Sequence, residues 1–179
     1  MRMRLIGLVL GLLLIPALAA ADDHRWDWYF GGSGGDGASK LAGIHQAIGI
    51  ALGQQGTRRK VAVVGDFSTQ FGSHDGIPVT QFAYMTGVRL MASRRSDKFK
   101  PSGHVLFGGV YQNDGLADTN DGAVAIGFGV EYIPNPTSPE LKHSFGIRAQ
   151  VDRIFRMSDV REDFWRASVG VIFRYGQHR

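Results

Sequence analysis

The sequence predicts an all-β fold: an eight-stranded, antiparallel, up-and-down transmembrane β-barrel preceded by a cleaved signal peptide. Three observations predict it: an export signal at the N-terminus, segments of alternating side chains, and turn-rich stretches between them. The expected strands cover residues 26–32, 41–52, 60–71, 80–91, 103–112, 122–133, 143–155 and 164–175.

The export signal has the usual three parts. Arg2 and Arg4 are basic, residues 5–15 are apolar, and residues 17–21 supply small side chains for cleavage. The apolar run is too short for a spanning helix, which needs about 20 residues. We expect cleavage after Ala19 or Ala21, so that residues 1–21 are the signal peptide and 22–179 form one outer-membrane β-barrel domain.

The run 164–175 shows the clearest alternation. One face carries Trp165, Ala167, Val169, Val171, Phe173 and Tyr175, and the other carries Arg166, Ser168, Gly170, Ile172 and Arg174. Ten residues at about 3.3 Å each, tilted by roughly 40°, give about 25 Å of height. This height matches the apolar band of an outer-membrane barrel.

Two other segments, 80–91 and 122–133, also place large apolar residues on one face and small or charged residues on the other. The second, third and fifth segments alternate less cleanly. Residues 41–52 could be drawn as a helix, but Gly43 and Gly49 weaken that drawing.

Alternation along a strand separates its two faces but does not tell which face points inward. The reverse arrangement, a soluble barrel with its apolar face inward, therefore stays open on alternation alone. The interior of an eight-stranded barrel is just wide enough for side chains to fill. Six apolar side chains per strand, with aromatic rings at both ends, would overfill it, whereas Arg, Ser and Gly would not.

The composition excludes several classes of function. The formal net charge is +4, part of which leaves with the signal peptide, so nucleic-acid binding has little support. The absence of cysteine excludes disulfides and thiolate chemistry. If the N-terminus is periplasmic, the outward connections are net acidic and the periplasmic connections are net basic.

The inward-facing charges form the main candidate site. We expect an ion network that plugs the barrel, because a buried charge is tolerated only when it is paired and hydrogen-bonded. With Phe155 opposite Phe164, Asp152 would lie near Arg166, and a second group would lie toward the periplasmic end. The expected network is Asp66, Arg89, Glu131, Arg148, Asp152, Arg166 and Arg174, and the expected aromatic girdle includes Trp165, Tyr175, Tyr132, Phe145 and Phe155.

Motifs for catalysis or cofactor binding are weak. Residues 32–37 fit G-x-G-x-x-G without the strand-turn-helix context of a nucleotide site, so we expect a surface loop. The six histidines lack metal-site spacing. His143 and Ser144 are adjacent on a strand and face opposite ways. We therefore expect no catalytic, cofactor-binding or metal site.

Four stretches carry a resemblance to a known family: 61–72 (VAVVGDFSTQFG), 104–111 (HVLFGGVY), 145–152 (FGIRAQVD) and 167–176 (ASVGVIFRYG). Together they resemble small bacterial outer-membrane β-barrel domain proteins, of the class of the outer-membrane protein A transmembrane barrel. The resemblance covers nearly all of residues 22–179. It implies eight antiparallel strands and outer-membrane insertion, and it implies no particular activity.

These observations favour a non-enzymatic outer-membrane barrel of a Gram-negative-type bacterium, with an occluded polar interior and a structural or surface-interaction role. The expected partners are outer-membrane lipids, lipopolysaccharide and the barrel assembly machinery, and the expected state is a monomer. Two alternatives stay open: a membrane-embedded lipid-modifying enzyme, which needs His, Ser and an acid together at one rim, and a soluble periplasmic barrel that binds a small apolar ligand.

Overall fold

The computed structural model describes residues 25–36, 41–52, 59–74, 76–92, 98–115, 117–134, 143–157 and 163–176. The expected signal peptide lies outside them. Eight antiparallel strands form a closed barrel in chain order: β1 (Arg25–Gly35), β2 (Leu41–Leu52), β3 (Arg59–His74), β4 (Ile77–Ala92), β5 (Phe99–Asn113), β6 (Asp118–Tyr132), β7 (His143–Arg156) and β8 (Phe164–Gly176). The expected fold class is confirmed.

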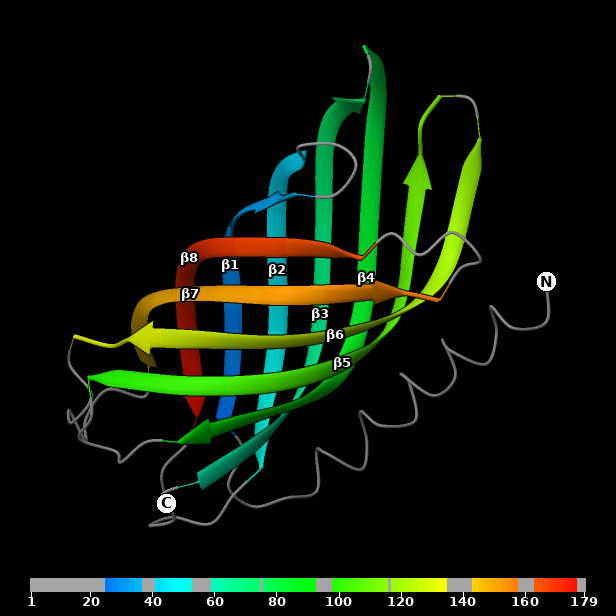
Figure 1. The fold of residues 1–179 in the computed structure, drawn as a ribbon. Coiled ribbons are helices and arrows are strands. Elements are labelled where there is room, and N and C mark those ends of the chain that lie inside the picture. The colour runs from blue at the N-terminus through cyan, green and yellow to red at the C-terminus, as the bar shows by residue number, and fades with distance from the viewer. Residues whose placement is uncertain are drawn as a thin grey trace.

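β1 pairs with both β2 and β8, and this second pairing closes the barrel. In Figure 1, β1 to β4 cross β5 to β8 steeply, as strands inclined to a barrel axis do when opposite walls are seen together. None of the described residues forms a helix long and apolar enough to cross a membrane.

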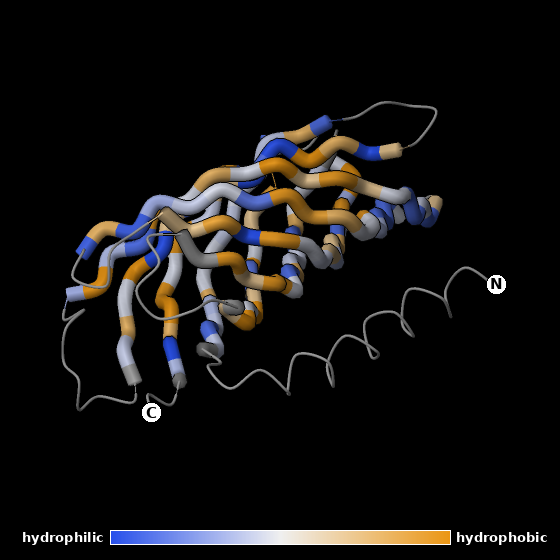
Figure 2. The backbone as a smooth tube through the Cα atoms, turned by 90° about the horizontal axis from the view of Figure 1, so that it is seen from below, coloured by the Kyte–Doolittle hydropathy of each residue, from blue (hydrophilic) through white to orange (hydrophobic). Residues whose placement is uncertain are grey.

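The orientation of the strands excludes the reverse arrangement. Trp165 and Phe173 are 45% and 53% exposed, whereas Arg166 and Arg174 are 0% and 5% exposed. The same alternation recurs around the barrel, and Figure 2 shows apolar and polar residues alternating along the strands. The outer wall is therefore aromatic and aliphatic, while guanidinium and carboxylate groups face inward.

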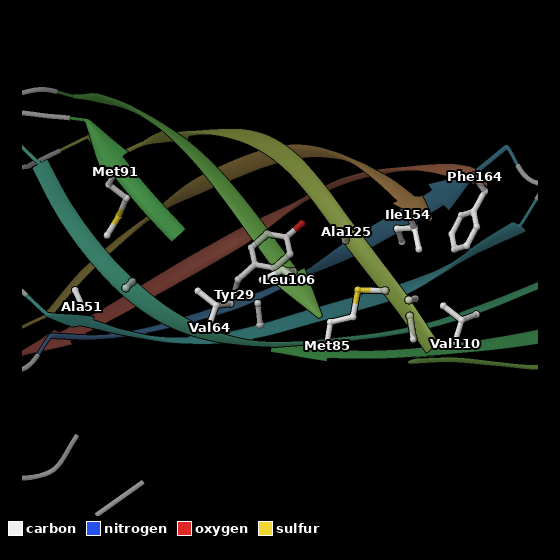
Figure 3. Close-up of a cluster of buried hydrophobic side chains, with 14 residues drawn as sticks. Tyr29, Ala51, Val64, Met85, Met91, Leu106, Val110, Ala125, Ile154 and Phe164 are labelled. Carbon is white, nitrogen blue, oxygen red and sulfur yellow. The ribbon is translucent and has the colours of Figure 1, made fainter. Parts of the chain in front are cut away.

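The interior is not wholly polar. Figure 3 shows a cluster of buried apolar side chains distributed along the inside of the barrel, with Tyr29 and Leu106 near its middle and Phe164 toward one end. Alanine contributes many of the other members. Small inner residues leave room for the long charged side chains that lie among them.

β3, β4, β5 and β6 are among the strands that are longer than the sequence predicts. β3 and β4 extend to a tight turn at Gly76, and β5 and β6 extend to a turn that contains Gly115; both glycines have positive φ, of 82° and 77°. These two hairpins project beyond the neighbouring strands (Figure 1). The predicted strands ended too early because Ser73, Asn113 and Asp118 are residue types typical of turns. A hairpin that extends beyond the apolar band also needs no apolar outer face.

Two further expectations are wrong. Gly32 to Gly35 continue β1 instead of forming a surface loop, with both neighbouring strands paired along them. The β7–β8 register places Ile154, and not Phe155, opposite Phe164. Opposed residues of an antiparallel pair share a face, and Phe155 faces outward while Phe164 faces inward.

Glycine permits the close approach of strands at the closing seam. Gly31 of β1 lies opposite Gly170 of β8. A Cβ on Gly31 would lie 2.3 Å from the Val169 carbonyl oxygen and 2.7 Å from the Gly170 Cα, and a Cβ on Gly170 would be as crowded. These distances exclude any side chain without a shift of the backbone.

Candidate functional site: the charged barrel interior

The seven residues of the predicted network are all buried inside the barrel, where they join Asp27, His45 and His104 in two clusters. The Arg166 cluster consists of Arg166, Asp66, Asp152, His45 and His104. The Glu131 cluster consists of Glu131, Asp27, Arg89, Arg148 and Arg174.

Arg166 joins two carboxylates from different walls. Its Nη1 lies 2.9 Å from Asp66 Oδ1 on β3, and its Nη2 lies 2.7 Å from Asp152 Oδ2 on β7. Its Nε also donates to Asp152 Oδ2 at 2.8 Å, and Nη1 donates to Ser68 Oγ at 3.0 Å. Arg166 is fully buried, so these contacts replace the water that its charge would otherwise bind.

Each carboxylate of the Arg166 cluster also holds an imidazole. His45 Nε2 lies 2.7 Å from Asp66 Oδ2, and His104 Nε2 lies 2.7 Å from Asp152 Oδ1. Gln150 Nε2 donates to Asp152 Oδ2 at 3.1 Å. The result is a continuous chain, from imidazole to carboxylate to guanidinium to carboxylate to imidazole, that crosses the interior.

The Glu131 cluster lies toward the end where β1 begins and β8 ends. Arg148 and Arg174 both pair with Glu131, whose side chain is fully buried. Asp27 Oδ1 lies 3.4 Å from Arg89 Nη1 and 3.7 Å from Arg148 Nη2. Arg148 therefore links the two carboxylates of this cluster.

Tyr29 lies between the clusters. Its ring contacts Arg148, with the guanidinium carbon 5.4 Å from the ring centroid, and meets the His45 ring edge to face at 5.1 Å. Across both clusters, four carboxylates match four guanidinium groups. The Arg166 cluster has more acid than guanidinium and the Glu131 cluster has the opposite excess, so the two attract each other along the barrel.

The aromatic girdle residues lie on the outer wall. Tyr175 and Phe145 occupy one end of β8 and β7, and Trp165 and Phe155 occupy the other; all four are exposed. Tyr132 is half-buried and packs against Phe99, with ring centroids 5.0 Å apart and ring planes tilted by 41°. The rings thus mark both ends of the apolar wall.

One arrangement has the residue types of a hydrolase. His45 Nδ1 lies 2.9 Å from Ser168 Oγ, and its Nε2 faces Asp66. A neutral imidazole that donates to Asp66 would accept from the Ser168 hydroxyl, as a general base does. Ser168 is only 7% exposed and points inward, and Asp66 is also held by Arg166, so the geometry supplies nucleophile and base without access for an acyl substrate.

The structure gives no support to the other chemical motifs. Among the described residues, no group of three or more His, Asp or Glu side chains could hold a metal ion. Ser144 lies on β7 opposite Arg174. His24 and His178 lie outside the described residues.

Sequence reasoning missed Asp27, Tyr29, and the roles of His45 and His104. Asp27 could have been found, because it alternates with Trp26 and Trp28, which are exposed on the outer wall. The histidines gave no such signal, since their strands mix polar and apolar residues on both faces: exposed Gln46 follows buried His45 on β2.

Known structures share this architecture, although no protein-family model and no curated protein sequence matches the chain. Neisserial surface protein A aligns over 85% of this chain and 96% of its own, with a TM-score of 0.58 and 10% identity. The N-terminal β-barrel domain of Pseudomonas aeruginosa OprF aligns over 85% and 97%, with a TM-score of 0.52 and 16% identity.

A third similar structure is Ail, the attachment invasion locus protein of Yersinia pestis. It aligns over 87% of this chain and 99% of its own, with a TM-score of 0.51 and 11% identity. The chain has the fold of these outer-membrane barrels. At such low identities the comparison establishes the eight-stranded fold and leaves ligands and partners to be argued from the site itself.

Proposed function

We propose that this protein is an integral outer-membrane barrel that is exported through a cleaved signal peptide and has a non-enzymatic structural or surface-interaction role. The observation that carries this proposal is the orientation of the wall. Trp28, Phe128 and Val169 are each more than half exposed, a surface that water would not tolerate around a whole barrel. Hydrocarbon would cover this surface, and aromatic rings at both ends suit the two interfaces.

The two ionic clusters support an occluded interior. They lie across the barrel at different levels, and apolar side chains occupy the space around them. Eight strands leave no wide channel. In this proposal the protein is a stable, non-conducting structural element of the envelope. It is a monomer that the barrel assembly machinery inserts and that outer-membrane lipids and lipopolysaccharide surround.

Cell fractionation tests this proposal. The protein should be recovered from the outer membrane only with detergent. The folded form should migrate differently from the boiled form on a gel, because a closed barrel resists detergent until it is heated. Recovery in the soluble periplasmic fraction, with no heat-dependent shift in mobility, would exclude membrane insertion.

One observation favours a second function, a lipid-modifying hydrolase: the contacts of His45 with Ser168 and Asp66. We expect no reaction of Ser168 with a fluorophosphonate probe in the folded protein, because its hydroxyl faces the closed interior. Labelling that disappears in Ser168→Ala, together with lipid A of altered mass in cells that produce the protein, would favour the hydrolase.

A further inference from the structure

A shallow, open apolar groove of about 710 Å³ crosses the outer wall over β6, β7, β8, β1 and β2. Gly34, Ala42, Ala149 and Ala167 line the groove with short side chains or none. The larger side chains of Phe128 and Val151 project farther from the wall. Spanning five strands at about 4.8 Å spacing, the groove is roughly 19 Å long. Its shape therefore suits an extended chain better than a compact molecule.

A cation lies at the edge of this groove. On β7, Arg153 follows Val151 as the next outward-facing residue. On the antiparallel β8, Trp165 lies opposite Arg153 and two residues before Ala167. Both Arg153 and Trp165 lie on the side of the groove away from the chain termini. The Arg153 guanidinium carbon lies 5.2 Å from the Trp165 ring centroid and 5.9 Å from that of Phe155. Cation–π contacts with the two rings keep the guanidinium at the end of the apolar wall where β7 ends and β8 begins.

Arg153 retains capacity to bind an anion. Within the described residues, its one hydrogen bond runs from Nη2 to Asp163 Oδ2 at 3.4 Å, and both side chains are about one-third exposed, at 35% and 30%. A guanidinium has five N–H donors in a planar fork that matches phosphate. The remaining donors can therefore bind a phosphate beside Asp163, or in its place.

We propose that the groove and Arg153 form one binding site for lipid A, with an acyl chain over Gly34, Ala149 and Ala167 and a phosphate on Arg153. The proposal rests on the outer-membrane insertion proposed above, with the connections after β1, β3, β5 and β7 outward. That orientation places Arg153 in the outer leaflet, where the phosphorylated lipid is lipid A. Charge complementarity and the apolar groove thus select the same amphipathic ligand.

Native mass spectrometry of the full-length mature protein can test the site, with purified lipid A or phosphatidylglycerol added to the detergent micelles. The wild type should retain one lipid A and at least tenfold less phosphatidylglycerol. Arg153→Gln, which removes the charge, and Ala167→Leu, which fills the floor, should each weaken lipid A retention about tenfold. Asp163→Asn, which removes the competing carboxylate, should retain lipid A at least as well as the wild type.

Ala92→Leu is the matched control. Ala92 is exposed at the last position of β4, a strand that does not line the groove. It should bind lipid A like the wild type. Unchanged retention in either Arg153→Gln or Ala167→Leu, or equal retention of the two lipids, would overturn the site.

The gel-mobility shift separates the two proposals. Variants that keep the heat-dependent shift but bind lipid A without selectivity would refute only the lipid site. If the wild type shows no shift, membrane insertion fails and the lipid site fails with it.

Discussion

Arg166 shows how a single residue can define the inside of this protein. It is fully buried, yet it bonds to carboxylates on β3 and β7 and to the Ser68 hydroxyl. Removing water from a guanidinium costs several kcal/mol unless such partners replace it. An assumed pairing of β7 with β8 predicted that Arg166 lies near Asp152, but not that it contacts Asp66, because β3 and β8 meet only across the interior.

At Glu131, truncation should be costly. Glu131→Ala leaves Arg148 and Arg174 buried without their shared carboxylate, so we expect the free energy of unfolding to fall by about 3–5 kcal/mol. Urea titration in detergent micelles measures this change. The control is Asp163→Ala, which breaks an exposed ion pair and should cost less than about 1 kcal/mol. Equal unfolding midpoints for Glu131→Ala and the wild type would contradict the ionic role.

Gly127 makes room for the contact between His104 and Asp152. A Cβ at this position would lie 2.1 Å from Asp152 Oδ1 and 2.5 Å from His104 Nε2. We expect Gly127→Ala to push these side chains apart and to lower the unfolding midpoint clearly. Gly103→Ala is the control, because its Cβ would have no neighbour closer than 3.7 Å and should leave the midpoint nearly unchanged.

At the scale of elements, the ends of β3 to β6 near Gly76 and Gly115 continue the barrel sheet beyond the ends of the neighbouring strands β2 and β7. β6 pairs with β7 only from Ala123 onward, and one more backbone bond runs from the Met157 N–H to the Gly122 carbonyl, so among the described residues 118–121 have no strand partner on that side. Arg156 at the end of β7 covers this edge. It donates to Gln112 Oε1 at 2.9 Å, Thr119 Oγ1 at 3.2 Å and Asp121 Oδ2 at 3.1 Å.

Arg156→Gln should loosen this edge. We expect amide hydrogens between residues 113 and 122 to exchange at least several-fold faster, because the side-chain contacts that hold β5 and β6 to β7 are lost. Exchange followed by mass spectrometry in micelles measures the change. Arg153→Gln on the outer face of the same strand should leave these amides unaffected; an equal effect of both variants would argue against the contact.

The strands show where sequence-based prediction works. β4, β6 and β8 have one apolar face and one small or charged face, so their inner and outer residues were predicted correctly. β2 was harder to interpret, because buried His45 and exposed Gln46 are both polar. The extended hairpin ends were missed because they lie beyond the apolar band of the outer wall, where outward-facing residues need not be apolar.

For the whole molecule, eight strands and a closed meander followed from spacing and alternation alone. Apart from the proximity of Arg166 and Asp152, the pairing of charges did not, since it depends on which residues meet across the interior once the register around the barrel is fixed. The predicted register of β7 and β8 was off by one residue, and the structure corrected it by placing Ile154 opposite Phe164. Parity therefore gives the face of a residue, and closure of the barrel gives its partner.

An occluded barrel should conduct poorly. In planar bilayers, we expect the wild type to show no steady channel currents, because two ionic clusters and apolar side chains lie across its interior. Arg166→Gln, checked for folding by its gel-mobility shift, should produce brief current events several times more often. Stable porin-like currents from the wild type would contradict occlusion.

The seam between β1 and β8 joins the two strands that are farthest apart in the sequence, since Arg25 lies opposite Gly176. No partial chain can complete this pairing, so the unfinished sheet has two unpaired edges until β8 is in place. During biogenesis, those edges are templates for pairing with a neighbouring chain. Loss of β8 would therefore leave an open sheet that is prone to aggregate, and not a smaller closed barrel.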